Sequence, residues 1–237
     1  MISVIIPTLN SEATLAASLS ALIPAAVDGL VREVIIADGG SSDATAKIAE
    51  SSGADTVLAG EMRSSRLIAG AERARFAWLM FVPADGVLGA GWEREAEVHI
   101  AKTDAGERKA GAAVFAFAVD DSGFAPRAVE AGTRLGQIVL GIASAEQGLL
   151  ISRALYNTVG GFKPLPALED VDMARRIGRR RLTRLRTPLL TATEHYPNGY
   201  GTHSWQFGLS LALYGAKVPI GCIAALRAGQ GARPASP

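Results

Sequence analysis

Short β-rich runs alternate with amphipathic segments in the first third of the chain, and this alternation constrains the fold more than any other feature. The β-rich runs occupy residues 2–7, 31–37, 56–58 and 79–82, and helical spacing of apolar residues fills 12–23, 44–52 and 64–76. This order predicts an α/β fold with a mostly parallel central sheet flanked by helices. Ligands of such sheets bind outside the carboxyl ends of the strands, so the polar loops there are candidate sites.

The second half of the chain is less regular. Strands are expected at 112–119, 147–151 and 189–193, and helices at 168–178 and 202–215. We find no internal repeat and no long linker. We therefore expect one domain over residues 1–228 and a flexible Gly/Pro/Ala-rich tail at 229–237.

The composition excludes several classes of protein. With 237 residues, 49% of them hydrophobic and 20% charged, the chain can bury a sizeable core and does not resemble a disordered protein. A formal net charge of +1 argues against a nucleic-acid partner. Cys222 is the only cysteine, which excludes an internal disulfide and a Cys-based zinc site and favours a cytoplasmic location.

The longest apolar stretch, residues 207–226, does not predict a transmembrane helix. Glycines, Lys217 and Pro219 interrupt it, whereas a span needs about 20 predominantly apolar residues. The N-terminus does not predict a signal peptide, because it lacks a basic segment and Pro7 cuts its apolar run short. Peripheral contact with a membrane remains an expectation for the C-terminal stretch.

Two isolated carboxylates follow β-rich runs. Asp38 lies in a loop of Gly and Ser, where it can accept hydrogen bonds from ribose hydroxyls or a base edge, or can simply cap a turn. Asp85 precedes Gly86, which is also a common turn pattern. One carboxylate together with substrate phosphates is nevertheless enough to hold Mg²⁺ or Mn²⁺.

Glu169, Asp170 and Asp172 stand at the start of the predicted helix 168–178. Carboxylates are favourable at a helix N-terminus, so capping is one explanation of all three. The alternative is a general base that takes a proton from an attacking hydroxyl. Spacing alone does not choose among the three residues.

Histidines and arginines supply weaker candidates. His195 and His203 lie among aromatic residues, where packing or hydrogen bonding is the commoner role than metal binding or acid–base chemistry. Seven arginines lie between Arg175 and Arg186. They predict either a solvated helix face or a site for anionic lipid head groups or a phosphorylated acceptor.

Four motifs occur in a fixed order along the chain: Ile5-Ile6-Pro7-Thr8-Leu9-Asn10-Ser11-Glu12; Val34-Ile35-Ile36-Ala37-Asp38-Gly39-Gly40-Ser41-Ser42-Asp43-Ala44-Thr45; Gln147-Gly148 through Gly160-Gly161-Phe162; and Leu168-Glu169-Asp170-Val171-Asp172. Together they resemble the family 2 glycosyltransferases, which have a GT-A fold. The closest subgroup is the small bacterial family 2-like glycosyltransferases. The resemblance covers residues 1–214.

The resemblance implies transfer of a sugar, with inversion at the anomeric carbon, from a UDP- or GDP-linked donor to an acceptor hydroxyl. The donor nucleotide would contact Pro7, Asn10, Glu12, Asp38, Gly39 and Arg63, with Asp38 at the base or ribose.

The family also implies a metal and a base. Asp85 would hold Mn²⁺ or Mg²⁺ against the diphosphate, where the metal offsets charge on the leaving group. Asp170 would be the base, with Glu169 beside it. The acceptor is expected to be a lipid or a small soluble metabolite. The arginine run and the apolar stretch after Phe207 favour an anionic or membrane-bound acceptor.

Three positions depart from the family pattern. Ile68 replaces a common Asn, Gly86 replaces a hydroxyl residue, and Glu146 stands where Asp usually precedes Gln-Gly. They motivate one alternative, a non-catalytic nucleotide-sugar-binding module. A nucleotidyltransferase is more distant, because the loop at 7–14 has neither the glycine nor the basic residues such an enzyme needs.

Overall fold

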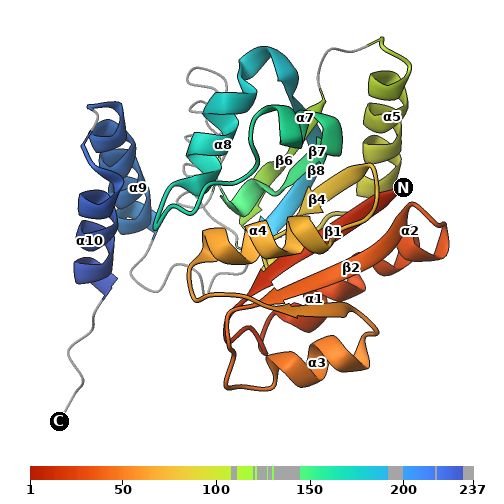
Figure 1. Ribbon diagram of the computed structural model, residues 1–237, viewed down its shortest axis with the longest axis horizontal. Helices are drawn as coiled ribbons and strands as arrows, with labels where there is room; N and C mark the ends of the chain where they lie inside the picture. Colours follow the sequence, from red (N-terminus) through yellow and green to blue (C-terminus); the bar gives the residue numbers. More distant parts are fainter. Residues whose placement is uncertain are drawn as a thin grey trace.

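The computed structural model describes residues 1–107, 111–119, 121, 127, 130, 145–191, 200–216 and 218–231, and these form an eight-stranded sheet with helices on both faces (Figure 1). The strand order is β3-β2-β1-β4-β7-β6-β8-β5. The strands are β1 (Ile2–Thr8), β2 (Val31–Asp38), β3 (Asp55–Leu58), β4 (Trp78–Phe81), β5 (Gly86–Leu88), β6 (Ala112–Val119), β7 (Leu149–Ser152) and β8 (Leu182–Thr191).

The sheet is mostly parallel, as the sequence predicts. β1 pairs in parallel with β2 and β4, β2 with β3, and β6 with β8. Among the described strands, β7 and β5 run antiparallel to their neighbours. The carboxyl ends of β1, β2 and β4 therefore share one edge, and the polar loops that follow them share it too.

Helices cover both faces of the sheet. Residues of α1 (Leu15–Ser20), α2 (Ile23–Val27), α3 (Thr45–Ser51) and α5 (Trp92–Asp104) enter the apolar cluster on one face. Residues of α4 (Arg63–Arg73), α7 (Arg153–Thr158) and α8 (Glu169–Ile177) enter the cluster on the other. Side chains of β1 alternate between the two clusters, with Val4 in the first and Ile5 in the second.

Two further helices, α9 (Tyr200–Gly215) and α10 (Ile220–Gly231), lie side by side at the left of Figure 1. They share a small apolar cluster with the start of α8, in which Leu168, Val171 and Ile223 are buried. No helix of the described residues is long and apolar enough to cross a membrane. The first residues of the expected tail continue α10 to Gly231, and 232–237 lie outside the described residues.

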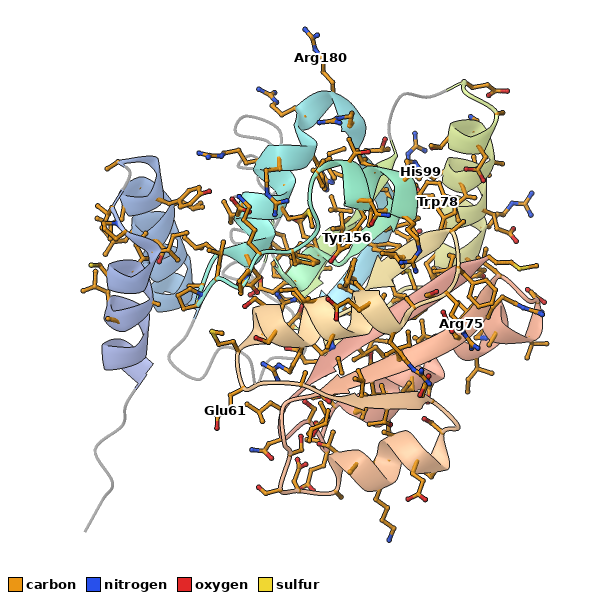
Figure 2. The ribbon with its side chains drawn as sticks, viewed as in Figure 1. Glu61, Arg75, Trp78, His99, Tyr156 and Arg180 are labelled. Carbon is orange, nitrogen blue, oxygen red and sulfur yellow. The ribbon has the colours of Figure 1, made fainter. Side chains whose placement is uncertain are left out.

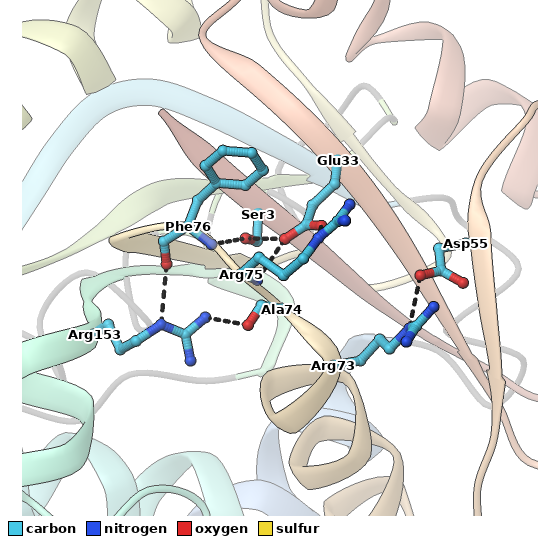
Figure 3. Close-up of polar contacts among 8 residues, drawn as sticks. All are labelled: Ser3, Glu33, Asp55, Arg73, Ala74, Arg75, Phe76 and Arg153. Atoms are coloured by element: carbon cyan, nitrogen blue, oxygen red, sulfur yellow. Dashed lines mark hydrogen bonds and ion pairs between the residues drawn. The ribbon is translucent and has the colours of Figure 1, made fainter.

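Partly buried polar contacts surround the amino ends of β1 and β4 (Figure 3). The Arg153 guanidinium donates to the carbonyl oxygens of Ala74 and Phe76 at 2.6 and 3.0 Å, beside the C-terminus of α4. The Ser3 hydroxyl donates to Glu33 at 2.5 Å. These contacts satisfy hydrogen-bonding groups at the amino ends of the strands. The polar loops that carry the candidate site residues lie at the opposite edge, after the carboxyl ends of the strands.

The structure differs from the sequence prediction in several places, among them the helices α5, α7 and α10, which the sequence analysis does not predict. The helix predicted at 12–23 is divided, because Pro24 opens α2 and a proline cannot continue the preceding helix. The strand expected from residue 189 begins at Leu182, so Arg184 and Arg186 lie on a strand and not on a helix face. The short strand β5 was not predicted, because it exists only through pairing with β8.

Candidate active site

The loops after β1 and β2 are hydrogen-bonded to each other. The Asn10 side-chain oxygen accepts from the Ser42 backbone N–H at 2.9 Å, and the Asn10 N–H donates to the Ser41 hydroxyl at 2.8 Å. The Glu12 carboxylate accepts from the Ala44 N–H at 2.8 Å. Asn10 has a left-handed backbone (φ 51), which asparagine tolerates better than most residues. Two of the predicted donor residues thus build one shared loop surface.

Asp38 is the centre of this surface. Its carboxylate accepts hydrogen bonds from the Thr8 hydroxyl, the Gly40 N–H, and both the N–H and the hydroxyl of Ser41, all at 2.6–2.9 Å. Burial alone would raise the pKa of Asp38, but these hydrogen bonds outweigh burial and lower it. A carboxylate has about four lone-pair sites, so Asp38 organises the loop with all of them in use.

The three carboxylates at the start of α8 differ in their partners. Glu169, at the first position of α8, forms an ion pair with Arg63 at the start of α4. Asp172 forms an ion pair with Arg176 at 2.7 Å. Asp170 has no ion pair among the described residues, and its carboxylate accepts a hydrogen bond from the Val171 N–H at 2.9 Å. The structure therefore separates three carboxylates that spacing could not.

Asp170 also lies in unusual surroundings. It lines a pocket whose other walls are mostly apolar: Arg63, Leu67, Phe81, Gly148, Leu149, Phe162, Met173, Ala174, Ile177 and Leu182. Burial first, and then the negative charge of Glu169, raise the pKa of Asp170 to about 6, although Arg63 acts in the opposite direction. A carboxyl group with such a pKa is largely ionised at neutral pH and is a stronger proton acceptor than an ordinary aspartate.

This pKa makes stability depend on pH in a defined direction. A carboxyl group whose pKa is raised on folding, here from 3.8 to about 6, favours the folded state below the lower value and loses that contribution as pH rises through the higher one. We expect Asp170→Asn to be more stable than the wild type at pH 8, by about 1–3 kcal/mol. Thermal unfolding at pH 4, 6 and 8 measures the difference. A stability difference between Asp170→Asn and the wild type that is as large at pH 4 as at pH 8 would contradict the assignment.

Arg66 was not identified from the sequence, although it lies one turn after Arg63 on α4. Its side chain is 8% exposed, and its Nε has no hydrogen-bond partner among the described residues. A Cβ built on Gly39 would come within 3.3 Å of Arg66 Cδ and 3.4 Å of its Nη1. Burial and Arg63 lower the pKa of Arg66, while Asp38 and Glu169 raise it. Arg66 is thus close to carboxylates from both the donor-side loop and α8.

Leu168 was also not identified from the sequence. It precedes Glu169 directly, is 2% exposed, and has a left-handed backbone (φ 57, ψ 26). That conformation costs a leucine roughly 1–2 kcal/mol, because Cβ crowds the following carbonyl oxygen. No sequence signal predicts this conformation at a leucine.

Asp85 follows β4 at the same edge of the sheet, and its side chain is partly buried. No group of three or more His, Cys, Asp or Glu residues suited to a metal occurs in the described residues. Gly86 leaves no room for the family's hydroxyl residue, because a Cβ there would lie 2.8 Å from the Pro83 ring. A metal at Asp85 would therefore take most of its ligands from a bound substrate and water.

Two arginines of the run, Arg176 and Arg181, bond to the backbone of neighbouring elements. Arg176 donates to the carbonyl oxygens of Val159 and Gly161, which ties the Gly160-Gly161-Phe162 turn to α8. Arg181 donates to the carbonyl of Ile177 at 2.8 Å. Arg180 is exposed and points away from the sheet in Figure 2. The run is divided among α8, a short helix at Arg179–Arg181 and β8, so it does not form a single helix face, although several of its arginines are exposed.

The remaining sequence candidates are placed as follows. Pro7 is buried in β1 beside Ala37 of β2. Ile68 packs against the apolar cluster that contains Ile5. The polar Asn that the family commonly has at this position would not make these apolar contacts. Glu146 is partly buried in the short helix before β7. His195 and the side chain of His203 lie outside the described residues.

The fold thus brings the Gly-Ser loop after β2 and the carboxylates at the start of α8 to the first turns of α4. The family model described as glycosyl transferase family 2 matches residues 3–96, which confirms the resemblance over that part of the chain. A comparison with curated protein sequences gives no significant match.

Solved structures agree with this fold. Glucosyl-3-phosphoglycerate synthase from Mycobacterium tuberculosis is similar with a TM-score of 0.62 and 21% identity, covering 92% of this chain and 81% of that one. The same enzyme in complex with Mn²⁺, UDP and glucosyl-3-phosphoglycerate gives a TM-score of 0.60 at 21% identity, with coverages of 92% and 81%. A mycobacterial protein gives a TM-score of 0.62 at 19% identity, with coverages of 92% and 76%. At these identities the likeness establishes the GT-A fold.

Proposed function

We propose that the protein is an inverting glycosyltransferase that moves a sugar from a nucleoside-diphosphate donor to an acceptor hydroxyl with the help of a divalent metal. The observation that carries the proposal is the meeting of three elements at the start of α4. Arg66 lies against the Gly39 loop and within electrostatic range of Glu169, and Arg63 is paired with Glu169. One bound molecule can therefore contact both the donor-side loop and α8.

The donor nucleotide is proposed to lie on the surface formed by the two loops. Asn10, Glu12, Asp38 and Gly39 come together there, and Pro7 is buried just before this surface in β1. Because Asp38 is fully hydrogen-bonded, it would reach a ribose or base only if the Thr8 or Ser41 hydroxyl rotates away. Its main role in this proposal is to hold the Gly40 and Ser41 N–H groups in place. Arg63 and Arg66 supply positive charge for the diphosphate.

Asp170 is the proposed general base. Glu169 and Asp172 are each engaged in an ion pair with an arginine, Arg63 and Arg176 respectively. Asp170 has neither restraint, and its raised pKa suits proton transfer near neutral pH. In an inverting transfer it would accept the proton of the acceptor hydroxyl as that oxygen attacks the anomeric carbon. Glu169 would act beside it by keeping Arg63 in position.

Asp85 is the proposed metal ligand. Its partly buried carboxylate lies after β4 at the loop edge of the sheet, and carboxylate oxygen suits a hard cation such as Mn²⁺ or Mg²⁺. Bound there, the metal would neutralise charge on the departing diphosphate. The M. tuberculosis synthase, which has the same fold, is described with Mn²⁺ and UDP bound.

This proposal predicts metal-dependent nucleotide binding. UDP with Mn²⁺ should raise the melting temperature of the wild type, because a ligand that binds only the folded state stabilises it by mass action. Asp85→Ala should lose the part of the shift that requires Mn²⁺. Asp28→Ala, an exposed aspartate at the end of α2, is the control and should keep it. A full Mn²⁺-dependent shift in Asp85→Ala would remove Asp85 from the metal site.

The acceptor is proposed to be an extended compound with an anionic group. The exposed Arg180 lies beyond the C-terminus of α8, and Asp170 lies at its beginning. The eight residue steps between the ends of this helix span roughly 12 Å. An acceptor that used both would have to cover that distance, as a lipid-linked acceptor at a membrane surface does.

A further inference from the structure

Leu168, the residue that leads into α8, has a strained backbone conformation that a leucine does not favour by itself. Two residues other than glycine have a positive φ in the described part of the chain, Asn10 and Leu168. Asparagine often adopts this conformation, whereas leucine rarely does. A strained, buried residue persists only where its surroundings hold it in place, and such residues are frequent at functional sites.

The surroundings of Leu168 come from the C-terminal helices. Its side chain shares a buried cluster with Val171 of α8 and Ile223 of α10, the latter 1% exposed. Partly buried residues of α9 and of the turn after it pack against this cluster: Leu211, Leu213, Tyr214 and Val218. Figure 1 shows α9 and α10 beside the segment that enters α8.

A second set of contacts joins α9 to the first turns of α8. The Tyr214 hydroxyl donates to Asp172 at 3.4 Å, and the Arg175 guanidinium lies 5.3 Å from the centre of the Tyr214 ring. The Asp172 N–H donates to the Leu168 carbonyl at 3.0 Å, which closes the first turn of α8 around Glu169 and Asp170. The direction of the Asp170 side chain therefore depends on where Leu168 is held.

We propose that α9 and α10 form a clamp that positions Asp170 by holding Leu168 in its left-handed conformation. This inference rests on the proposed function for its consequence in catalysis, and on the backbone and packing of Leu168 for its structural content. Leu168 and Ile223 are positioning residues, because neither lines the pocket that contains Asp170. The clamp connects a peripheral helix pair to the proposed base through one side chain.

The test removes the clamp from its far side. In Ile223→Ala, the carboxyl carbon of Asp170 is followed by ¹³C NMR across a pH titration and assigned with Asp170→Asn. The other charges facing this carboxyl group are Glu169 and Arg63, and the substitution leaves both in place. We expect the pKa of Asp170 to fall by about one unit towards its ordinary value of 3.8 as the side chain leaves its buried position.

Two further variants separate clamping from general destabilisation. Leu168→Gly permits the left-handed backbone but lacks the side chain, and it should behave like Ile223→Ala. Leu22→Ala removes a leucine that is 2% exposed in the cluster on the other face of the sheet, and it should lower the melting temperature without changing the Asp170 titration. An unchanged titration in Ile223→Ala, or a wild-type titration in Leu168→Gly, would overturn the proposal.

Donor chemistry gives an independent readout. With UDP-glucose and Mn²⁺ as the probe, hydrolysis by Ile223→Ala should be slower by roughly 10- to 100-fold, because small displacements of a catalytic group have effects of this size. The affinity for UDP should stay unchanged, since the donor-side loops are not touched. If the wild type neither binds UDP nor hydrolyses the donor, the proposed function fails, while the titration still decides whether the clamp exists.

Discussion

Asp170→Asn is expected to reduce sugar transfer by roughly 10²- to 10⁴-fold while leaving the affinity for UDP unchanged. Asparagine has nearly the same shape and keeps an oxygen for the Val171 N–H, but it cannot take up the acceptor proton. The donor-side loops that are proposed to bind UDP make no contact with this side chain in the described hydrogen bonds. Release of UDP from UDP-sugar donors, and calorimetry with UDP, measure the two quantities.

The matched control is Asp104→Asn, at an exposed aspartate that ends α5 on the other face of the sheet. This change removes a carboxylate far from α8, so turnover per folded molecule should remain close to the wild type. Wild-type turnover in Asp170→Asn would remove Asp170 as the base. Donor binding without any turnover in the wild type would instead favour the non-catalytic binding module.

Gly70→Ala is expected to destabilise the protein by about 2 kcal/mol or more, although alanine is intrinsically the better helix residue. A Cβ at Gly70 would lie 2.3 Å from Cγ2 of Ile5, which is fully buried in β1. Overpacking of this kind costs about 1–3 kcal/mol or more. The gain in helix propensity is only about 1 kcal/mol. The clash therefore dominates, and thermal or denaturant unfolding measures the loss.

Gly208→Ala provides the opposite case. Gly208 lies within α9, is exposed, and has nothing within 4 Å of the position a Cβ would occupy. Only the propensity effect applies there, so stability should be unchanged or rise by up to about 1 kcal/mol.

Equal stabilities of Gly70→Ala and the wild type would show that α4 does not pack as closely on β1 as described. Because α4 carries Arg63 and Arg66, Gly70→Ala should also weaken UDP binding.

Much of the sheet could be predicted because its central strands carry their own signals. β6 has the predicted bounds because it is a continuous apolar run, and β2 extends only one residue beyond its prediction because its β-branched residues end at Asp38 and Gly39. The strand β5 has no such signal. Its residues Gly86 and Leu88 are strand residues only because Thr191 and Leu189 pair with them from about a hundred residues away.

The sequence predicted which types of residue form the candidate site, but it did not predict which of their side chains pair with one another. Local sequence indicated that Asp38 ends a strand in a flexible loop and that three carboxylates begin a helix, because strand ends, glycines and helix starts are local features. It could not indicate which carboxylate lacks a cationic partner. The partner of Glu169 is Arg63, 106 positions away. Burial and the charges of Glu169 and Arg63 together set the pKa of Asp170.

The sequence by itself determined the alternation of strands and helices, the edge of the sheet where the loops gather, and the chemical groups present there. These depend on periodicity and on residue chemistry, which are properties of short segments. Only the tertiary structure decided that Arg66 is buried beside Gly39, that Leu168 is strained against Ile223, and that Asp170 is the carboxylate without an ion pair among the described residues. Burial, electrostatic neighbours and steric restraint are set by residues that meet only when the chain folds.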